Sequence, residues 1–137
     1  MNVAFLDTSF LLAIAIANDQ FHEPAQAHWV ESEQSANHHK FVTTSYILNE
    51  VVTYLNSRSL HAKAVEIGTL LLAAEIVRLV HVEEPLFLEG WRFFERHRDK
   101  TYSLTDCISF VLMKQLGIQT AFTFDHHFQQ AGFLKEP

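Results

Sequence analysis

Two short apolar runs, near opposite ends of the chain, each stop at an aspartate. "VAFL" is followed by Asp7, and "AFTF" is followed by Asp125. Short apolar runs rich in β-branched and aromatic residues are typical of buried strands. An acid directly after such a strand either caps the next helix or belongs to a site at the edge of a sheet.

Strand-like runs alternate with helical stretches along the 137 residues. The pattern predicts strands at residues 3–6, 41–43, 76–82 and 119–124, and helices at residues 8–17, 23–35, 46–57, 60–74, 85–96 and 104–116. After residue 124 we expect a short helix or loop that ends in "GFL". This alternation indicates an α/β fold: a three-layer domain with a mostly parallel central sheet of about four to five strands flanked by helices. We expect residues 1–137 to form a single domain.

The composition restricts the class of protein. Hydrophobic residues make up 48% of the chain and charged residues 19%, which is enough apolar material for a packed core and argues against disorder. The single cysteine, Cys107, cannot form an internal disulfide, which fits a reducing cytoplasm. The apolar run at residues 10–17 follows no Lys or Arg and is too short to span a bilayer, so we expect a cytoplasmic protein with no membrane partner.

The net charge bears on nucleic-acid binding. The formal charge is −6, whereas proteins that simply clamp a nucleic-acid backbone are usually basic. An enzyme that reaches nucleic acid through metal ions and one local basic patch is still compatible with this charge.

Asp7 and Asp106 can each be explained as helix caps. Asp7 precedes a helix, although Thr8 and Ser9 could cap that helix equally well. Asp106 stands three residues after Ser103, which is the spacing of a capping box. Asp106 also lies on a local polar spot of a helix that is otherwise apolar, so a role in a site remains open.

Glu50 and Asp125 have similar alternatives. Glu50 lies on a polar stripe of an apolar helix, which is what a solvated face would look like, yet no Lys or Arg follows it until Arg58. Asp125 could cap a short terminal helix. His126 and His127 could bind a metal, but adjacent side chains point in different directions, and no third soft ligand stands at zinc-finger spacing.

Together the four acids predict a divalent cation site. Two carboxylates about 5 Å apart repel each other by roughly 3 kcal/mol at an effective dielectric constant near 20. A fold that gathers several carboxylates therefore needs a cation between them. Oxygen ligands suit Mg²⁺ or Mn²⁺, and such an ion can generate hydroxide from water and stabilise the charge on a phosphodiester during its hydrolysis.

Four stretches carry a resemblance to a known family: "AFLDTSFLLA", "TTSYILNEVVTYL", "YSLTDCISFVLM" and "AFTFDHHFQQAGF". In this order they resemble the PIN-domain family, and most of all the VapC-type toxins of bacterial toxin–antitoxin pairs. The resemblance covers nearly the whole chain. It maps the acidic residues of the family onto Asp7, Glu50, Asp106 and Asp125, and its supporting hydroxyls onto Thr8 or Ser9 and onto Thr123.

The resemblance implies a ribonuclease that depends on Mg²⁺ or Mn²⁺ and hydrolyses RNA phosphodiester bonds. It also implies a parallel sheet, an antitoxin protein as partner and a homodimer. One alternative is another phosphoryl-transfer hydrolase with an aspartyl site, but Ser9 stands where the usual second acid would be. The other alternative is a non-catalytic PIN-fold binding module, which would have no need to retain four mutually repelling acids.

The densest basic stretch is "WRFFERHRDK", which precedes the helix that carries Asp106. Its cations are candidates for contact with RNA phosphates: Arg92, Arg96, Arg98 and Lys100. The alternative is a solvated helix end, because cations near a helix C-terminus interact favourably with the helix dipole.

Overall fold

The computed structural model describes residues 2–35 and 38–137. Its five strands are β1 (Asn2–Leu6), β2 (His39–Thr44), β3 (Val77–Val80), β4 (Thr120–Phe122) and β5 (Leu134–Glu136). They form one sheet in the order β3-β2-β1-β4-β5, and every neighbouring pair is parallel. The prediction of a mostly parallel sheet of four to five strands is confirmed, and the sheet is parallel throughout.

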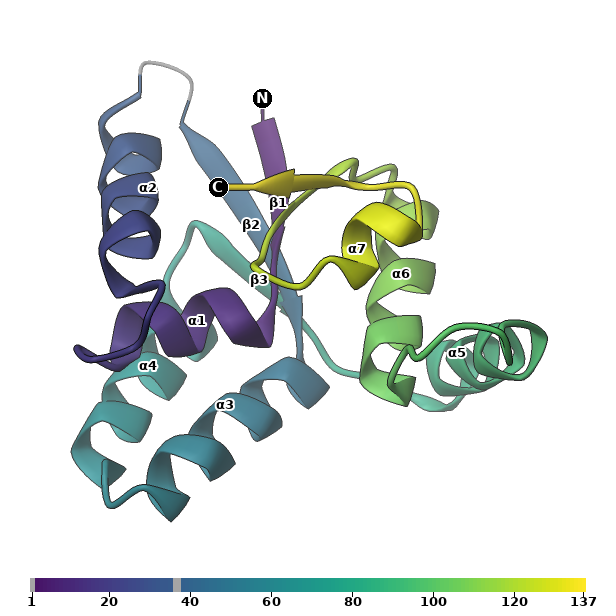
Figure 1. Cartoon of the computed structure of the whole chain (residues 1–137), viewed down its shortest axis with the longest axis horizontal. Helices are drawn as coiled ribbons and strands as arrows, with labels where there is room; N and C mark the ends of the chain where they lie inside the picture. Colours follow the sequence, from purple (N-terminus) through teal and green to yellow (C-terminus); the bar gives the residue numbers. More distant parts are fainter. Residues whose placement is uncertain (1, 36–37) are drawn as a thin grey trace.

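The helices of the described residues lie in two groups on opposite sides of the sheet (Figure 1). The first group contains α1 (Thr8–Ala15), α2 (His22–Gln34), α3 (Ser45–Ser57) and α4 (His61–Ala73). The second contains α5 (Glu84–Arg96), α6 (Leu104–Leu116) and α7 (His127–Gln130). The chain moves outward from β1 through β2 to β3 and then returns to β4 and β5 on the other side of β1. Because crossovers between parallel strands are right-handed, this reversal places the two groups of helices on opposite faces.

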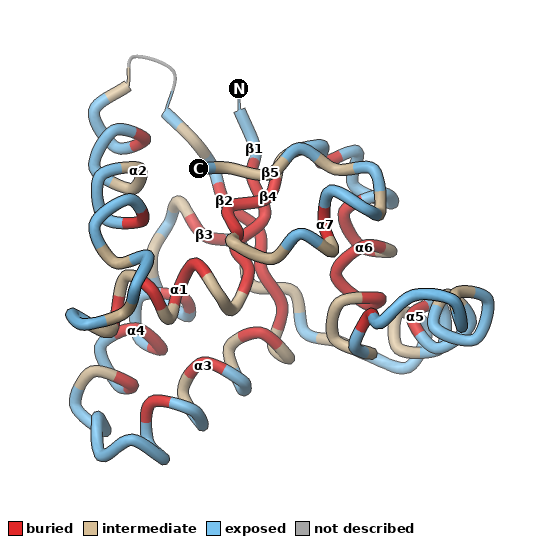
Figure 2. The backbone as a smooth tube through the Cα atoms, viewed as in Figure 1, coloured by how far each residue is buried: buried red, intermediate tan, exposed pale blue. Residues whose placement is uncertain are grey.

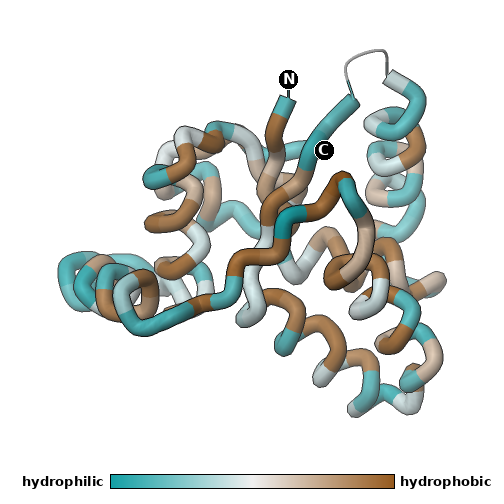
Figure 3. The backbone as a smooth tube through the Cα atoms, turned by 180° about the vertical axis from the view of Figure 1, so that it is seen from behind, coloured by the Kyte–Doolittle hydropathy of each residue, from teal (hydrophilic) through white to brown (hydrophobic). Residues whose placement is uncertain are grey.

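The core follows from the central position of β1. Ala4, Phe5 and Leu6 have no exposed surface, since helices cover both faces of this strand. Figure 2 shows buried residues along the central strands and on the inner turns of α1 and α6. Seen from behind, hydrophobic residues gather toward the middle of the molecule and hydrophilic residues on the outer turns of the helices (Figure 3). In the described part of the chain, no helix is long and apolar enough to cross a membrane.

Helix α6 begins and ends where the sequence predicts. The Ser103 hydroxyl accepts a hydrogen bond from the Asp106 backbone N–H, and the Asp106 carboxylate accepts one from the Ser103 N–H, which completes the capping box. Gly117 ends the helix with φ of 69°, a left-handed conformation in which a side chain would be strained. At Gly90, α5 approaches α6 so closely that a Cβ atom would overlap the Ile108 side chain and lie 3.1 Å from the Ile108 Cα.

Several predicted boundaries need correction. The first helix, predicted to reach residue 17, ends at Ala15 because Ile16 adopts an extended conformation. The fourth predicted strand, expected to extend to residue 124, ends at Phe122. The sequence analysis missed β5, which has three residues and includes Lys135 and Glu136. Such a short edge strand carries no hydrophobic alternation, and tertiary hydrogen bonds define it: Leu134 N–H to Gln119 O (2.9 Å) is one.

Candidate metal centre at the edge of the sheet

The aspartates that follow two strands lie at the point where the strand order reverses. β1 pairs with β2 on one side and with β4 on the other, so a crevice is expected beyond the carboxyl ends of β1 and β4. Asp7 directly follows β1, and its N–H donates to the carbonyl of Phe122 at the end of β4 (3.2 Å). The segment from Thr123 to Asp125 follows β4. The structure therefore brings Asp7 and the second strand end to the same edge of the sheet.

Asp7 is 5% exposed, and its side chain accepts hydrogen bonds from Ser9 and Thr123 at a single carboxylate oxygen. Oδ2 accepts from the Thr123 hydroxyl (2.7 Å), from the Ser9 hydroxyl (2.9 Å) and from the Ser9 N–H (3.4 Å). The last of these makes Asp7 the N-cap of α1, so the capping alternative is also correct. The Thr8 backbone also interacts with the carboxyl group and lowers its pKa, but none of the three bonds above reaches Asp7 Oδ1. That oxygen is left available for another ligand.

The two hydroxyls that hold Asp7 are themselves held by the backbone of the next segment. The Ser9 oxygen accepts from the Phe124 N–H, and the Thr123 oxygen accepts from the Asp125 N–H, both at 2.9 Å. Thr123 has no exposed surface. These bonds tie the start of α1 to the segment after β4, and they fix the orientation of the Asp7 carboxylate.

Asp106, Asp125 and His127 form a compact cluster beside Asp7. One ligand atom from each lies within 4.8 Å of the other two. The His127 Nδ1 atom is 3.2 Å from Asp106 Oδ2 and 3.3 Å from Asp125 Oδ1. The other ring nitrogen, Nε2, is 2.9 Å from the Thr101 hydroxyl oxygen. Asp106 thus has both of the roles considered for it, as part of a capping box and as part of an acidic cluster.

The pKa values show that three of the acids act on one another. Burial raises the pKa of Asp7 to about 6; the hydrogen bonds from Thr123 and Ser9 oppose this rise, and the negative charge of Asp106 adds to it. Burial also raises the pKa of Asp106; hydrogen bonds from Ser103 and His127 lower it, and the charge of Asp125 raises it further. The anions of Asp7 and Asp106 are therefore destabilised by burial and by a neighbouring acid. A cation placed between them would relieve both effects.

The donor atoms of the cluster fit a divalent cation. Asp106 and Asp125 belong to the cluster of close ligand atoms, Asp7 interacts electrostatically with Asp106, and all three carboxylates offer the hard oxygen ligands that Mg²⁺ and Mn²⁺ prefer. His127 adds one imidazole nitrogen. No soft thiolate joins them in the described part of the chain: the one cysteine, Cys107, is buried, and burial raises the pKa of its thiol to about 11.

Glu50 lies at the margin of the site. It is exposed on α3, and its Oε1 accepts a hydrogen bond from the Thr8 hydroxyl (2.7 Å). Thr8 is the neighbour of Asp7, so Glu50 is linked to the site through one side chain. Neither Glu50 nor Asp7 belongs to the cluster of mutually close ligand atoms, which contains Asp106, Asp125 and His127. Of the predicted supporting hydroxyls, Thr8 contacts Glu50, whereas Ser9 and Thr123 contact Asp7.

His127 was not among the site residues predicted from the sequence. The sequence analysis treated His126 and His127 alike, but the structure separates them. The His127 N–H donates to Asp125 Oδ1 (2.9 Å), a turn that directs its ring back to the acids. His126 points outward, with a side chain that is 70% exposed and an Nδ1 atom 3.9 Å from Asp125. The sequence does contain a signal for this difference, the spacing Asp-x-His at the start of a short helix. The side chain of an aspartate often accepts a hydrogen bond from the backbone N–H two residues later, which here is the N–H of His127.

The predicted basic residues divide into two pairs. On α5, the guanidinium of Arg92 pairs with Glu89 (2.6 Å), and that of Arg96 lies over the Phe93 ring. Arg98 and Lys100 are exposed in the connection between α5 and α6, where the Lys100 Nζ atom lies 3.9 Å from the neighbouring Asp99 carboxylate. That same connection reaches the cluster, since Thr101 contacts His127. The second pair is therefore the one that the chain holds beside the acids.

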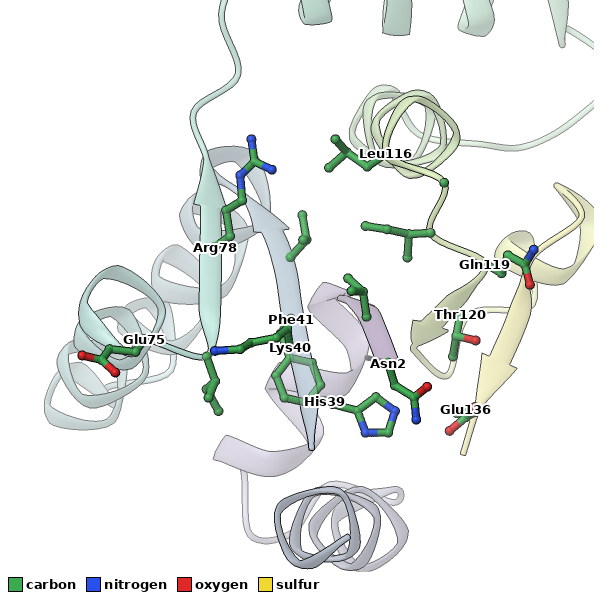
Figure 4. A pocket seen from close by; sticks show the side chains of 15 residues that line it. Asn2, His39, Lys40, Phe41, Glu75, Arg78, Leu116, Gln119, Thr120 and Glu136 are labelled. Atoms are coloured by element: carbon green, nitrogen blue, oxygen red, sulfur yellow. The ribbon is translucent and has the colours of Figure 1, made fainter. Parts of the chain in front are cut away.

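A cavity of about 640 Å³ lies away from the acids, near the first residues of β1, β2 and β4. Asn2, His39, Lys40 and Thr120 line it, with Arg78 on β3 (Figure 4). Asp7 and Asp125 follow the opposite ends of β1 and β4. The cavity is thus separate from the candidate metal centre.

Comparisons with known proteins agree with this arrangement. The PIN-domain model matches residues 4–134. The chain is 35% identical over 131 residues to the 23S rRNA-specific endonuclease VapC20 of Mycobacterium tuberculosis, a match that covers 96% of this chain and 95% of that protein. This chain therefore belongs to the PIN-domain family. The resemblance to VapC-type toxins that the sequence motifs indicated is confirmed.

Solved structures extend the likeness to three dimensions. The crystal structure of Mycobacterium tuberculosis VapC20, a toxin that cleaves the sarcin–ricin loop, matches with a TM-score of 0.85 and 34% identity over 97% of both chains. The crystal structure of FitAcB from Neisseria gonorrhoeae matches with a TM-score of 0.64 and 16% identity, covering 98% of this chain and 96% of that one. The second match shows the shared fold.

Proposed function

We propose that this protein is a metal-dependent endoribonuclease that cleaves ribosomal RNA at the sarcin–ricin loop. The observation that carries the proposal is the match to VapC20, which acts on this RNA and is 35% identical to this chain over 131 residues. The gathering of Asp7, Asp106 and Asp125 at the switch point of the sheet supports a reaction that uses a cation.

In this proposal the three aspartates would hold a Mg²⁺ or Mn²⁺ ion, and Asp7 would contribute Oδ1, the oxygen that Ser9 and Thr123 do not bond. Such an ion supplies hydroxide from bound water and neutralises the charge that develops on the phosphate. Ser9 and Thr123 keep Asp7 in one orientation through the bonds to Oδ2. Their positions explain why hydroxyls are needed at these two places: a methyl group at either would leave Oδ2 with fewer donors in a buried site.

Glu50 completes the site from the solvent side. Its bond to Thr8 holds one carboxylate oxygen beside the residue that follows Asp7. An exposed carboxylate loses little of its hydration when it binds a water or an ion, so it can engage and release either one at small cost. We infer that Glu50 is a ligand on the open side of the centre, where RNA enters.

The connection between α5 and α6 binds the RNA backbone in this proposal. Arg98 and Lys100 are exposed there, and Thr101 anchors the connection to His127. Cations at such a place bind phosphates independently of the base sequence. A local pair of cations next to the acids is compatible with the overall charge of −6, because the cluster itself contributes much of the local negative charge until an ion binds.

The relative also indicates partners. VapC20 is described as a toxin, and we infer that this chain is likewise controlled by an antitoxin protein. A ribosomal substrate would require the protein to act in the cytoplasm, which fits the expectation from its single cysteine. The homodimer stays a prediction, and light scattering of the purified chain would measure it.

The test uses a synthetic sarcin–ricin loop hairpin beside intact 23S rRNA in ribosomes. We expect one cleavage in each when Mg²⁺ or Mn²⁺ is present, and none with a chelator. A hairpin of equal length with a permuted loop controls for non-specific cleavage. Asp7→Asn and Asp106→Asn should each abolish the reaction. Cleavage that continues in chelator, or that is equal in both hairpins, would contradict the metal requirement or the substrate, respectively.

A further inference from the structure

We propose that His127 supplies a nitrogen ligand to the metal centre and that the centre consequently prefers Mn²⁺ to Mg²⁺. This inference rests on the proposed function, since it concerns the same ion. The inference goes beyond the proposed function in two ways. It assigns an imidazole ligand to the centre in addition to the carboxylates, and it states which of the two ions the centre binds more tightly.

The spacing of the three side chains supports a shared ion. The His127 Nδ1 atom lies 3.2 Å from an Asp106 oxygen and 3.3 Å from an Asp125 oxygen. Neighbouring ligands of a six-coordinate ion, each about 2.1 Å from it, lie about 3 Å apart. A charge-assisted N–H···O bond is shorter, about 2.7–2.9 Å. The contact of Nδ1 with Asp106 also has the geometry of an N–H···O hydrogen bond, so an ion bound by the three side chains would take the place of a ring proton that now lies between two carboxylates.

The surroundings of the ring can accommodate the tautomer that binds a metal. When an ion displaces the Nδ1 proton that bonds Asp106, Nε2 carries the ring proton and can donate a hydrogen bond to the Thr101 hydroxyl oxygen, 2.9 Å away. That leaves the lone pair of Nδ1 directed at the acids. Metal-binding histidines usually have their second nitrogen fixed in this way by a hydrogen-bond acceptor. The edge of the ring also packs against Tyr102, with centroids 5.4 Å apart at 81°.

The choice of ion follows from the type of donor. Mg²⁺ demands oxygen ligands in a nearly ideal octahedron and retains several of its waters. Imidazole nitrogen binds transition metals, and Mn²⁺ accepts both carboxylate oxygen and imidazole. A centre with three aspartates and one imidazole should therefore bind Mn²⁺ more tightly than Mg²⁺. A centre with carboxylates alone would discriminate less between them.

The adjacent histidine provides a matched control. His126 has the same chemistry, but its side chain is 70% exposed and its Nδ1 is 3.9 Å from Asp125. His126→Asn should leave metal binding unchanged. His127→Asn places an amide where Nδ1 stands, so it keeps a polar group of similar reach while removing the imidazole. His127→Asp converts the donor set to oxygen alone.

The experiment measures Mn²⁺ binding by electron paramagnetic resonance, with Mg²⁺ as competitor, in the parent and the three variants. In the parent we expect bound Mn²⁺ to show coupling to a ¹⁴N nucleus in the pulsed spectrum, and Mg²⁺ to displace it only at about ten-fold or greater excess. His126→Asn should retain both properties. His127→Asn and His127→Asp should lose the nitrogen coupling, and the preference for Mn²⁺ should fall by about ten-fold. Circular dichroism in chelator identifies any variant that fails to fold.

The outcomes separate this inference from the proposed function. If Mn²⁺ binds and RNA is cleaved, but the parent shows no nitrogen coupling, His127 is not a ligand and the ribonuclease proposal stands. If the coupling persists in both His127 variants of folded protein, the nitrogen comes from elsewhere and the inference is also wrong. If no divalent ion binds the parent, both proposals fail together.

Discussion

The Thr123 hydroxyl donates a 2.7 Å hydrogen bond to Asp7 Oδ2, and the two residues are 116 positions apart in the chain. Thr123 follows β4 and Asp7 follows β1, so this bond forms only when the two strands are paired. The bond holds Oδ2, the same oxygen that accepts from Ser9, so neither of these hydroxyls occupies Oδ1. The assembly of the sheet therefore sets the orientation of the carboxylate on which the site depends.

Thr123→Val should weaken both the fold and the site. Valine has the same shape, but it removes the donor to Asp7 and the acceptor of the Asp125 N–H in a fully buried position. We expect a loss of about 1–3 kcal/mol in the free energy of unfolding and a fall in cleavage of at least about ten-fold. Denaturant melts and the hairpin assay measure the two effects. Thr120→Val, three residues earlier in the chain, is the control, and an equal loss in both variants would contradict a specific role for the Thr123 hydroxyl.

Asp7→Asn should stabilise the metal-free protein, and the gain should depend on pH. The pKa of Asp7 is raised from 3.8 to about 6 in the folded protein, so between these values the folded state holds a proton that the unfolded state has released. The parent therefore loses stability as the pH rises through this window, and above it carries the full cost of a buried anion, about 3 kcal/mol as an upper bound. Asparagine does not titrate and avoids this cost.

Thermal melts in chelator at pH 8, 6 and 4 check this prediction. The variant should melt above the parent at pH 8, and the gap should close toward pH 4, where the Asp7 carboxyl of the parent is largely protonated. Added Mn²⁺ should raise the melting temperature of the parent by mass action and that of the variant much less. A difference that does not change with pH would show that the Asp7 carboxylate is not destabilised by burial.

The positions of Asp7 and Asp125 at one edge of the sheet could be predicted from the sequence, because each acid is recognised from its neighbours in the chain and the topology of a parallel sheet brings the two together. Each acid ends an apolar run, and parallel strands bring their carboxyl ends to one edge. β5 could not be predicted in this way, because its three residues become a strand only through pairing with β4. The difference between His126 and His127 also depends on geometry: the turn at Asp125 directs one ring toward the acids and leaves the other in solvent.

The substitution Glu50→Gln should show whether Glu50 is a metal ligand or only a residue of the solvated face of α3. Glu50 is exposed, so we expect the stability of the metal-free protein to change by no more than about 0.5 kcal/mol. A solvent-side ligand should nevertheless lose metal affinity and cleavage when its charge is removed. Mn²⁺ titration and the hairpin assay measure both, with Glu33→Gln on α2 as an exposed control. If Glu50→Gln matches Glu33→Gln in both assays, Glu50 belongs to the solvated face and the centre has three aspartates.

Two glycines within helices should respond in opposite directions to alanine. At Gly90 a Cβ atom would overlap the Ile108 side chain and lie 3.1 Å from its Cα, so Gly90→Ala should force α5 away from α6 and destabilise the fold by about 1–3 kcal/mol. At Gly68 the nearest atom to a new Cβ is the Val52 side chain at 3.4 Å. Gly68→Ala should be stabilising by up to about 1 kcal/mol, because alanine favours the helix. Denaturant melts compare the two, and a stable Gly90→Ala protein would contradict the close packing of α5 on α6.

If the connection between α5 and α6 contacts RNA, substitutions in it should change how strongly the RNA affinity depends on salt concentration. Arg98→Gln and Lys100→Gln each remove one exposed cation beside the cluster. If each contacts a phosphate, RNA affinity should fall at low salt, and the slope of log affinity against log salt should flatten by about 0.7–0.9 per substitution. Metal affinity should stay the same, since neither residue belongs to the cluster. Binding is measured with the metal-free protein, so that cleavage does not interfere.

The control for these two variants must remove the same charge from another part of the molecule. Arg78 lines the cavity near the opposite ends of the strands (Figure 4). Arg78→Gln changes the net charge by the same amount, so it should leave the salt slope unchanged if RNA lies over the acids. An equal change of the salt slope in all three variants would mean that RNA binding depends only on the overall charge of the protein. In that case the connection would be an ordinary solvated helix end, which is the alternative that the sequence left open for it.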